Sequence, residues 1–460
     1  MQVVTIETPD LGDRSYLIHD GSTGVVIDPQ RDIDRMTSAI DQAGVLVALV
    51  AETHMHNDYV SGGLQLARQL GATYVTHVGD PVAFDRTGVR DGDRLEAGTM
   101  TVAVVATPGH TPNHLSYVVT APGEVPLLFS GGNLLYGSVG RTDLVAPELT
   151  EELTHHQYHS ARKMAEVLPD DAVVFPTHGF GSFCSSGATE IVPSSTIGVQ
   201  RRGNPAFTTD DEEAFVTELI AGLAAYPRYY AHMGPANLAG AGPVDLDRPI
   251  EPVDAEVLRS RLAAGEWVVD VRARTAYAAK HLRGTISIEL GDEFATYVGW
   301  VLPYGEPITL VADSALEVAQ ARRALARIGI DQLAGATDRG IDAVAAAGTV
   351  TTYDRAQWEH LCDTLVDCGD HPPVVLDVRR EDEHAAGHVH GAINIPVFDL
   401  LRRIDEIPPG DVWVHCRSGF RAGLAASILE RAGRRVVHVD DLFERAEQVG
   451  VTLALPVAAR

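Results

Sequence analysis

The chain of 460 residues carries 36 basic and 63 acidic side chains, for a net charge of −27. This acidic excess argues against a nucleic acid or an anionic membrane surface as a partner, so an anionic substrate would need a local basic pocket. At roughly 150 residues per domain, the length predicts about three domains.

Cysteine usage and hydropathy indicate the compartment. The four cysteines are Cys184, Cys362, Cys368 and Cys416. Four in so long a chain do not make a disulfide framework, and the first residues lack the basic-then-apolar pattern of a signal peptide. No stretch approaches the roughly 18 uninterrupted apolar residues of a membrane span. We therefore expect a soluble, cytoplasmic protein.

The first segment, residues 1–234, alternates short apolar runs with amphipathic helical stretches, which predicts mixed α/β structure. Histidines follow several of the strand-like runs. His54, His56 and Asp58 stand at one strand-to-helix turn, where residues two apart share a face, so both imidazoles can bind one ion while the carboxylate orients or bridges. Later turns add His110 and His178. This recurrence predicts a metal site.

Residues 233–252 are rich in Gly, Pro and Ala and indicate a linker. A weak internal repeat follows, which predicts two homologous α/β domains over residues 253–346 and 352–460. The repeated runs are 267–272 with 281–286 in one copy, and 374–379 with 388–393 in the other.

Only the second copy ends its second strand in a cysteine, Cys416, and the first has Asp313 and Ser314 at the corresponding place. A thiol between a strand and a helix faces the helix N-terminus. Inward-pointing N–H groups and a nearby guanidinium also favour the thiolate, which is the nucleophile. A buried structural cysteine is the alternative, which this polar setting disfavours.

Three motifs in residues 250–460 resemble the rhodanese family of sulfurtransferases. They are Leu-Asp-Val-Arg at 376–379, Gly-His-Val-x-Gly-Ala-Ile-Asn-Ile-Pro at 387–396 and Cys-Arg-Ser-Gly-x-Arg at 416–421. The resemblance implies a five-stranded parallel sheet with helices on both faces and a persulfide on Cys416, with Arg421 as the second catalytic group. It also implies a substrate-binding loop of Arg417, Ser418, Gly419 and Phe420, and an inactive first copy that acts as a structural spacer.

A phosphatase is the natural competitor for this loop, because cysteines in anion-binding loops also attack phosphorus. Four residues lie between Cys416 and Arg421, one fewer than in the dual-specificity phosphatases that resemble this fold. The shorter ring favours sulfur transfer over binding of a tetrahedral phosphate.

Residues 1–234 resemble the metallo-β-lactamase superfamily, whose marker is His-x-His-x-Asp-His with further histidines downstream. The resemblance implies an αββα sandwich, with two sheets face to face, helices outside and a metal site at one edge. Within the superfamily, Thr-Pro-Gly-His-Thr-Pro at 107–112, Gly-Arg-Thr-Asp at 140–143 and the rhodanese fusion are most similar to persulfide dioxygenases. Hydroxyacylglutathione hydrolases are the nearest alternative.

Two positions depart from the superfamily pattern. Tyr59 replaces the last histidine of the marker, and Gly132 stands where the family has a metal-binding carboxylate. These changes argue against a binuclear zinc site. The resemblance leaves His54, His56 and His110 as donors for one divalent metal, with Fe(II) favoured over Zn(II). The auxiliary groups are Asp58, Asn133 and His178.

Together these features predict metal-dependent oxidation of a low-molecular-weight thiol persulfide to sulfite, coupled to sulfur transfer among thiosulfate, sulfite and thiols through Cys416. The alternatives are a zinc thioester hydrolase fused to a sulfurtransferase, and a sulfur carrier with a non-catalytic first domain. Arg141 is a candidate for binding a substrate carboxylate. Cys184 either packs or touches the metal site, and the remaining cysteines, Cys362 and Cys368, are expected to be inert. The thiol carrier, the direction of transfer and homo-oligomerisation stay open.

Overall fold

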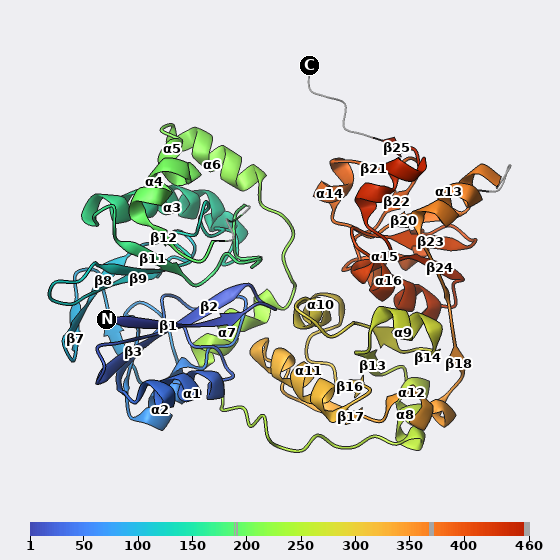
Figure 1. Cartoon of the computed structure of the whole chain (residues 1–460), viewed down its shortest axis with the longest axis horizontal. Coiled ribbons are helices and arrows are strands. Elements are labelled where there is room, and N and C mark those ends of the chain that lie inside the picture. Colours follow the sequence, from blue (N-terminus) through green and yellow to red (C-terminus); the bar gives the residue numbers. More distant parts are fainter. Residues whose placement is uncertain (188, 190–191, 368–371, 455–460) are drawn as a thin grey trace. The chain divides into compact units, whose positions relative to one another are not determined.

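The computed structural model describes residues 1–187, 189, 192–367 and 372–454. The chain divides into two compact units, residues 1–246 with 325–329 and residues 247–324 with 330–460 (Figure 1). Cys368, expected to be inert, lies outside the described residues. None of the helices in the described part of the chain combines the length and apolar character that a membrane span requires.

The first unit contains two six-stranded sheets. One has the order β1-β2-β3-β4-β5-β6, with β1 Gln2–Thr8, β2 Asp13–His19, β3 Thr23–Ile27, β4 Leu46–Ala51, β5 Thr73–His77 and β6 Thr87–Val89. The other has the order β12-β11-β10-β9-β8-β7, with β7 Arg94–Ala97, β8 Met100–Ala106, β9 Leu115–Thr120, β10 Leu127–Gly131, β11 Val173–Pro176 and β12 Ser195–Thr196.

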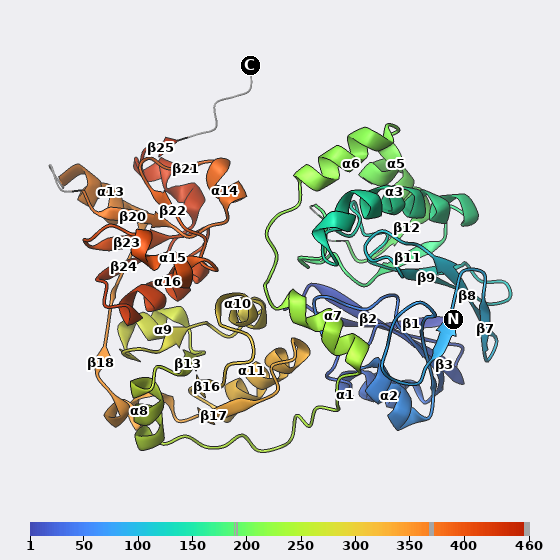
Figure 2. The same ribbon diagram turned by 180° about the vertical axis from the view of Figure 1, so that it is seen from behind.

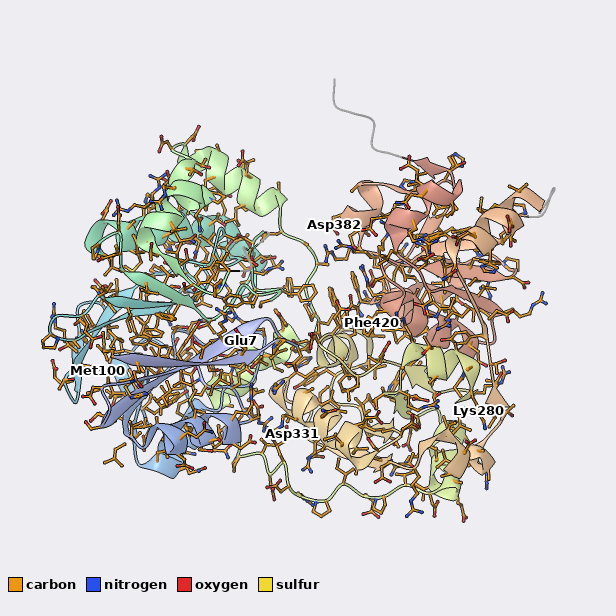
Figure 3. The ribbon with its side chains drawn as sticks, in the orientation of Figure 1. Glu7, Met100, Lys280, Asp331, Asp382 and Phe420 are labelled. Carbon is orange, nitrogen blue, oxygen red and sulfur yellow. The ribbon has the colours of Figure 1, made fainter. Side chains whose placement is uncertain are left out.

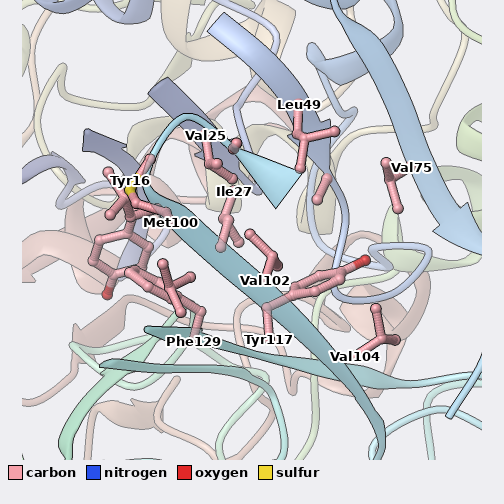
Figure 4. Packing of buried hydrophobic residues seen from close by; sticks show 14 of the residues in the cluster. Tyr16, Val25, Ile27, Leu49, Val75, Met100, Val102, Val104, Tyr117 and Phe129 are labelled. Carbon is pink, nitrogen blue, oxygen red and sulfur yellow. The ribbon is translucent and has the colours of Figure 1, made fainter. Parts of the chain in front are cut away.

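The core of this unit lies between the two sheets. Side chains from the first sheet, including Tyr16, Val25 and Ile27, meet side chains from the second, including Val102 and Phe129 (Figure 4). Strand β8 shows why: its alternate residues are buried, as expected for a strand with one face in a core. Burial of these facing apolar side chains stabilises the packing of one sheet on the other.

Helices cover the outer faces of both sheets (Figures 1 and 2). Helices α1 and α2 pack on the first sheet through an apolar cluster that includes Met36, Ile40 and Leu64. Helix α3 packs on the second sheet, through Met164 among others. This arrangement confirms the predicted αββα sandwich. The helices are α1 Asp34–Ala43, α2 Gly63–Leu70, η1 Pro147–Leu149, α3 Thr150–Val167, α4 Ile197–Gly203, α5 Pro205–Thr208, α6 Glu212–Ala221 and α7 Tyr230–Ala239.

The second unit contains two parallel sheets, as predicted. The first has the order β15-β13-β16-β17, with β13 Trp267–Asp270, β15 Ile286–Ser287, β16 Ile308–Val311 and β17 Leu333–Thr337. The second has the order β19-β24-β23-β20-β22, with β19 Asp354–Ala356, β20 Val374–Asp377, β22 Ile393–Asn394, β23 Val412–His415 and β24 Val436–Val439. Two small antiparallel pairs join β14 His281–Leu282 to β18 Val350–Thr351 and β21 His388–Val389 to β25 Leu453–Ala454.

The expected five strands are present only in the second copy. In the first copy, the place of the fifth strand is held by an isolated bridge between Pro252 and Ala336. Proline lacks an N–H group, so it weakens pairing at a sheet edge. The helices of this unit are α8 Ala255–Ala263, α9 Arg274–Ala279, α10 Phe294–Val301, α11 Ala315–Arg327, α12 Gly340–Ala343, η2 Ala345–Ala347, α13 Trp358–Asp367, α14 Glu381–Ala385, α15 Leu400–Arg403, η3 Ile404–Glu406, α16 Phe420–Arg431, η4 Phe443–Arg445 and η5 Glu447–Val449.

Both copies build the same buried ion pair, at the end of β13 in the first copy and at the end of β20 in the second. Arg272 donates to Asp270 at 2.7 Å and to the carbonyl of Lys280. Arg379 donates in the same way to Asp377, at 2.6 Å, and to the carbonyl of residue 387. This shared hydrogen-bond pattern supports the internal repeat. Because contact density joins both copies in one unit, the predicted boundary between residues 346 and 352 stays a proposal.

Candidate functional site

Four imidazoles meet at one edge of the sandwich in the first unit. His54 and His56 follow β4, His110 follows β8 and His178 follows β11, and all four are buried. The ring centroid of His54 lies 4.2 Å from that of His56, 4.8 Å from that of His110 and 5.2 Å from that of His178. Side chains far apart in the sequence therefore surround a common point, as a metal site requires.

Two ring nitrogens face each other in this cluster. The Thr53 hydroxyl donates to Asp28 at 2.7 Å, so it accepts from Nδ1 of His54, 2.9 Å away. Nδ1 of His178 donates to Asp13 at 2.8 Å. Both rings direct Nε2 inward, and these two nitrogens lie 3.3 Å apart. A proton on one of these nitrogens, or a cation between them, would satisfy both.

His110 presents a further inward-facing nitrogen. Its Nδ1 donates to the carbonyl of Arg141 at 2.7 Å, so the neutral ring carries its lone pair on Nε2. Burial, together with the charge of His178, lowers the pKa of His110 to about 3 and keeps the ring neutral. Among the described residues Nε2 has no hydrogen-bond partner. A neutral, oriented and unsatisfied imidazole is the form that binds a metal.

His56 is held from the opposite side by carboxylates. Its Nε2 lies 3.3 Å from Asp28 and 3.3 Å from Glu52, while Nδ1 is buried and has no partner among the described residues. Burial alone would lower the pKa of His56, but these two carboxylates raise it to about 9. Tyr59 stacks on the ring and its hydroxyl lies 2.9 Å from Nε2. The tyrosine thus supports His56 where the superfamily marker has another histidine.

Asp58 is a buried carboxylate that lacks the usual hydrogen bonds. Its Oδ2 lies 3.3 Å from Nδ1 of His178, but that nitrogen donates to Asp13, and neither oxygen of Asp58 has a well-formed hydrogen bond from the described residues. Burial alone would lower the pKa of His178, but Asp58 and Asp13 raise it well above its ordinary value. A buried carboxylate with so few hydrogen bonds is costly, and a cation beside it would reduce that cost.

These donors fit one divalent ion. Ligand atoms of His54, His56 and His178 lie within 4.8 Å of one another. His178, expected only as an auxiliary group, therefore stands at the centre of the cluster. Asn133, the other auxiliary candidate, is fully buried, and its side-chain oxygen and nitrogen have no partners among the described residues.

Gly132 makes room for the His110 ring. A Cβ atom at this position would lie 2.2 Å from Cδ2 of His110, and one at Gly140 would lie 2.7 Å from Nδ1 of the same ring. The imidazole therefore lies against both glycines, which are themselves joined by a hydrogen bond from the N–H of Gly140 to the carbonyl of Gly132. It occupies the space beside Gly132 into which a carboxylate side chain would extend.

His114 was missed at the sequence level, although it stands four residues after His110. It is fully buried, and its ring stacks on that of His54 with centroids 5.0 Å apart. Its Nε2 accepts the N–H of Gly132 at 3.0 Å, and its Nδ1 lies 2.9 Å from the Thr107 hydroxyl. Both ring nitrogens are used, so His114 supports the cluster rather than offering a lone pair to it.

Arg141 holds the chain around the cluster. Its guanidinium is buried and donates to Asp143 at 2.7 and 2.8 Å and to the carbonyls of Phe183 and Ala224. The guanidinium therefore directs its hydrogen bonds to acceptors within the protein. Binding of a substrate carboxylate, the role suggested by sequence, has no support in these contacts.

The second candidate site is the loop that follows β23. Cys416 is buried, and its Sγ accepts a hydrogen bond from the N–H of Gly419 at 3.2 Å. Gly419 has φ of +94°, and a Cβ there would lie 2.0 Å from Asp440, so glycine is required. Helix α16 begins at the next residue, Phe420, which is labelled in Figure 3. The N–H group and the helix end both stabilise negative charge on sulfur.

The remaining loop residues divide by exposure. Arg421 is half-buried and forms a bidentate pair with Glu383 of α14, at 2.6 and 2.8 Å. Arg417 and Ser418 are exposed, and the guanidinium of Arg417 lies 3.6 Å from Glu444. Glu383 was not identified from the sequence, because its partner lies 38 residues away along the chain.

The first copy lies against this loop. The ring of Tyr297 in α10 is 5.3 Å from that of Phe420, and Trp300 stacks on Phe398 with centroids 4.3 Å apart. In the first copy's own loop, Glu317 accepts from the N–H groups of Asp313 and Ser314. That loop binds its own carboxylate, while α10 helps to enclose the loop of the second copy.

Comparison with known proteins supports two kinds of domain. Residues 10–178 match the profile of the Metallo-beta-lactamase superfamily, and residues 362–445 match that of the Rhodanese-like domain. A metallo-beta-lactamase from Staphylococcus aureus subsp. aureus COL has a crystal structure that matches with a TM-score of 0.65 and 29% identity, covering 73% of this chain and 98% of that one. The chain therefore carries a metallo-beta-lactamase fold followed by a rhodanese-like domain.

Curated relatives of the first region include both hydroxyacylglutathione hydrolases and persulfide dioxygenases. Hydroxyacylglutathione hydrolase of Rhizobium etli is 32% identical over 169 residues, which are 36% of this chain and 61% of that protein. Persulfide dioxygenase ETHE1, mitochondrial, of Homo sapiens is 28% identical over 203 residues, or 43% of this chain and 73% of that protein. The alignment thus spans about three fifths of the hydrolase, and similarity alone does not separate the two reactions.

Proposed function

Because the chain joins a metallo-beta-lactamase domain to a rhodanese-like domain, we propose that it is an enzyme of sulfane-sulfur metabolism. The first domain would hold one divalent metal, with Fe(II) favoured, and oxidise a low-molecular-weight thiol persulfide to sulfite. The second would transfer sulfur through Cys416. The observation that carries the proposal is the presence on one chain of inward imidazole lone pairs and a thiol bound by a loop N–H group.

Each side chain of the first site has a defined task in this proposal. His54, His56, His110 and His178 would hold the ion, and the hydrogen bonds to Nδ1 of His54, His110 and His178 fix which nitrogen each of these three presents. A bound ion would supply a Lewis acid for an anionic sulfur and the redox chemistry that oxidation by O₂ needs. Burial of the cluster excludes bulk water from the reacting sulfur.

The second site supports a balanced sulfur transfer. The Cys416 thiolate attacks the sulfane sulfur of thiosulfate, the sulfur–sulfur bond breaks, and sulfite leaves with the electron pair. The persulfide on Cys416 then gives its terminal sulfur to an acceptor thiolate, which restores the enzyme thiolate. The N–H of Gly419 stabilises the anionic sulfur, while Arg421, held by Glu383, places a positive charge at the far end of the loop.

A zinc thioester hydrolase is the second candidate, and the Rhizobium etli relative favours it. The residues at the second-metal position count against a binuclear form of that enzyme. The hydroxyl of Tyr59 is hydrogen-bonded to Nε2 of His56, and Gly132 has no carboxylate to bind a metal. A mononuclear hydrolase stays the rival reaction.

Metal analysis and oxygen uptake distinguish these candidates. We expect anaerobically purified protein to contain about one iron per chain and to consume O₂ with glutathione persulfide. His110→Ala should lose metal and uptake, whereas the exposed His159→Ala, as a matched control, should retain both. Zinc with thioester cleavage and no uptake would establish the hydrolase. Retained iron without uptake would count against dioxygenation.

Loss of the carboxylate that holds Arg421 should slow sulfur transfer. For Glu383→Gln we expect kcat/KM with thiosulfate to fall about 10- to 100-fold, because a bidentate charge-assisted pair is lost, at about 1.5–3 kcal/mol. Glu444→Gln is the matched control, since its contact with Arg417 is exposed and long. Steady-state kinetics measures both, and equal effects in the two variants would contradict a positioning role for Glu383.

A further inference from the structure

Cys184 lies beside the imidazole cluster, and the proposed function does not use it. It follows β11 in the chain and is fully buried. Its Sγ and ring nitrogens of His110 and His178 all lie within 4.8 Å of one another. Its other polar neighbours include the carboxylate of Asp58 and the hydroxyl of Tyr230, which lies 3.9 Å from the sulfur.

Backbone hydrogen bonds fix the thiol relative to His110. The N–H of Arg141 donates to the carbonyl of Cys184 at 2.9 Å, and the carbonyl of Arg141 accepts from Nδ1 of His110 at 2.7 Å. Gly140 and Ser185 form an adjacent β-bridge. One short stretch of chain therefore orients both the imidazole and the thiol. Such external support is typical of metal ligands.

Unsatisfied buried atoms provide an independent sign of a missing cation. Among the described residues, Nε2 of His110 and both carboxylate oxygens of Asp58 have no hydrogen-bond partner, and both side chains are at least 99% buried. Buried acceptors without hydrogen-bond partners are costly. A cation bound near His110 and Asp58 would interact with all of these atoms and reduce that cost. A water molecule or a proton would satisfy only some of them.

We propose that Cys184 is a thiolate ligand of the metal site, together with His110 and His178, and supplies the anionic donor that Gly132 lacks. On binding, the thiol loses its proton to solvent and a metal–sulfur bond forms, with no change in metal oxidation state. Sulfur and imidazole donors select a borderline-soft divalent ion such as Fe(II) or Zn(II) over Mg(II) or Ca(II). The inference rests on the metal site of the proposed function but not on its reaction.

The geometry needs only a small adjustment. Bonds of about 2.3 Å to sulfur and 2.0–2.1 Å to nitrogen put ligand atoms roughly 3.3–3.7 Å apart on a tetrahedral ion. The three ligand atoms lie within 4.8 Å of one another, so the distances between them need to shorten by about 1 Å at most when an ion binds. Asp58 stands near enough to His178 to serve as a further donor or to neutralise the ion.

Cobalt spectroscopy tests the sulfur ligand. We would load the full-length Cys416→Ser protein with Co(II) without oxygen, so that the loop thiol cannot contribute. We expect a thiolate-to-cobalt charge-transfer band in the near ultraviolet, its loss in a further Cys184→Ser change, and at least tenfold weaker binding. Adding Cys362→Ser instead, as the matched control, should leave the band and the affinity unchanged.

The outcomes separate this inference from the proposed function. Cobalt bound without the band would overturn the sulfur ligand and leave an imidazole site intact. Failure to bind Co(II), Fe(II) or Zn(II) at all would overturn both. If Cys184→Ser does not fold, X-ray absorption of the zinc-loaded Cys416→Ser protein decides instead. A sulfur neighbour at roughly 2.3 Å supports the ligand, and a shell of nitrogen and oxygen alone excludes it.

Discussion

Cys416→Ser is expected to abolish sulfur transfer from thiosulfate, with kcat reduced by at least about 10⁴-fold. The sulfur atom forms the bond in each half of the proposed reaction, and a serine hydroxyl neither ionises readily nor forms a stable persulfide. The loop around it should survive, because the N–H of Gly419 can bond an oxygen as it bonds Sγ. The loss is therefore chemical rather than structural.

Two measurements check this expectation. Formation of thiocyanate from thiosulfate and cyanide measures turnover. Intact-protein mass spectrometry detects the gain of one sulfur atom when the unsubstituted protein reacts with thiosulfate. Cys362→Ser is the matched control, because Cys362 is a half-buried thiol on α13, outside the loop. Persulfide formation that persists in Cys416→Ser but disappears in Cys362→Ser would overturn the assignment. Metal content should be the same in both variants.

The loop that begins at Cys416 was predictable because its parts are consecutive in the sequence. A strand, a short polar run and a helix place Cys416 and Gly419 together whatever the rest of the chain does. Glu383 was not predictable by the same route. It reaches Arg421 from another helix, and only the packing of α14 on the sheet brings the two together.

The histidine cluster of the first unit was less predictable, because its parts are far apart in the sequence. Histidines after strands indicated which turns would meet, but not which ring nitrogens would face inward. His178 became central through its contact with His54, and His114 joined the cluster by accepting the N–H of Gly132. Both roles depend on distances of about 3 Å between residues that follow or precede different strands, which residue spacing along one strand does not determine.

In the first copy of the repeat, the loop that corresponds to the Cys416 loop binds a carboxylate of its own copy. Asp313 and Ser314 donate to Glu317 through their N–H groups. The copy still contributes Tyr297 and Trp300 to the surroundings of the active loop. The sequence predicted an inactive spacer. In the structure, helix α10 of the first copy also packs against the Cys416 loop of the second copy.

Gly132→Asp, which restores the carboxylate of the superfamily pattern, is expected to weaken metal binding rather than strengthen it. The new Cβ would lie 2.2 Å from Cδ2 of His110. That ring cannot retreat easily, because Gly140 also lies against it and the carbonyl of Arg141 accepts a hydrogen bond from its Nδ1. Overpacking of this kind costs about 1–3 kcal/mol, and a second buried carboxylate beside Asp58 adds to it.

Displacement of His110 should remove one ligand, so the apparent affinity for Co(II) or Fe(II) should fall by at least about tenfold, together with a lower Tm. Gly203→Asp is the matched control, because no atom lies within 4 Å of a Cβ at that exposed position. Metal titration and thermal unfolding measure the two effects. Tighter binding, or a second bound ion, in Gly132→Asp would mean that the ring moves aside. It would also mean that the glycine, rather than the position of His110, is what limits this site to one ion.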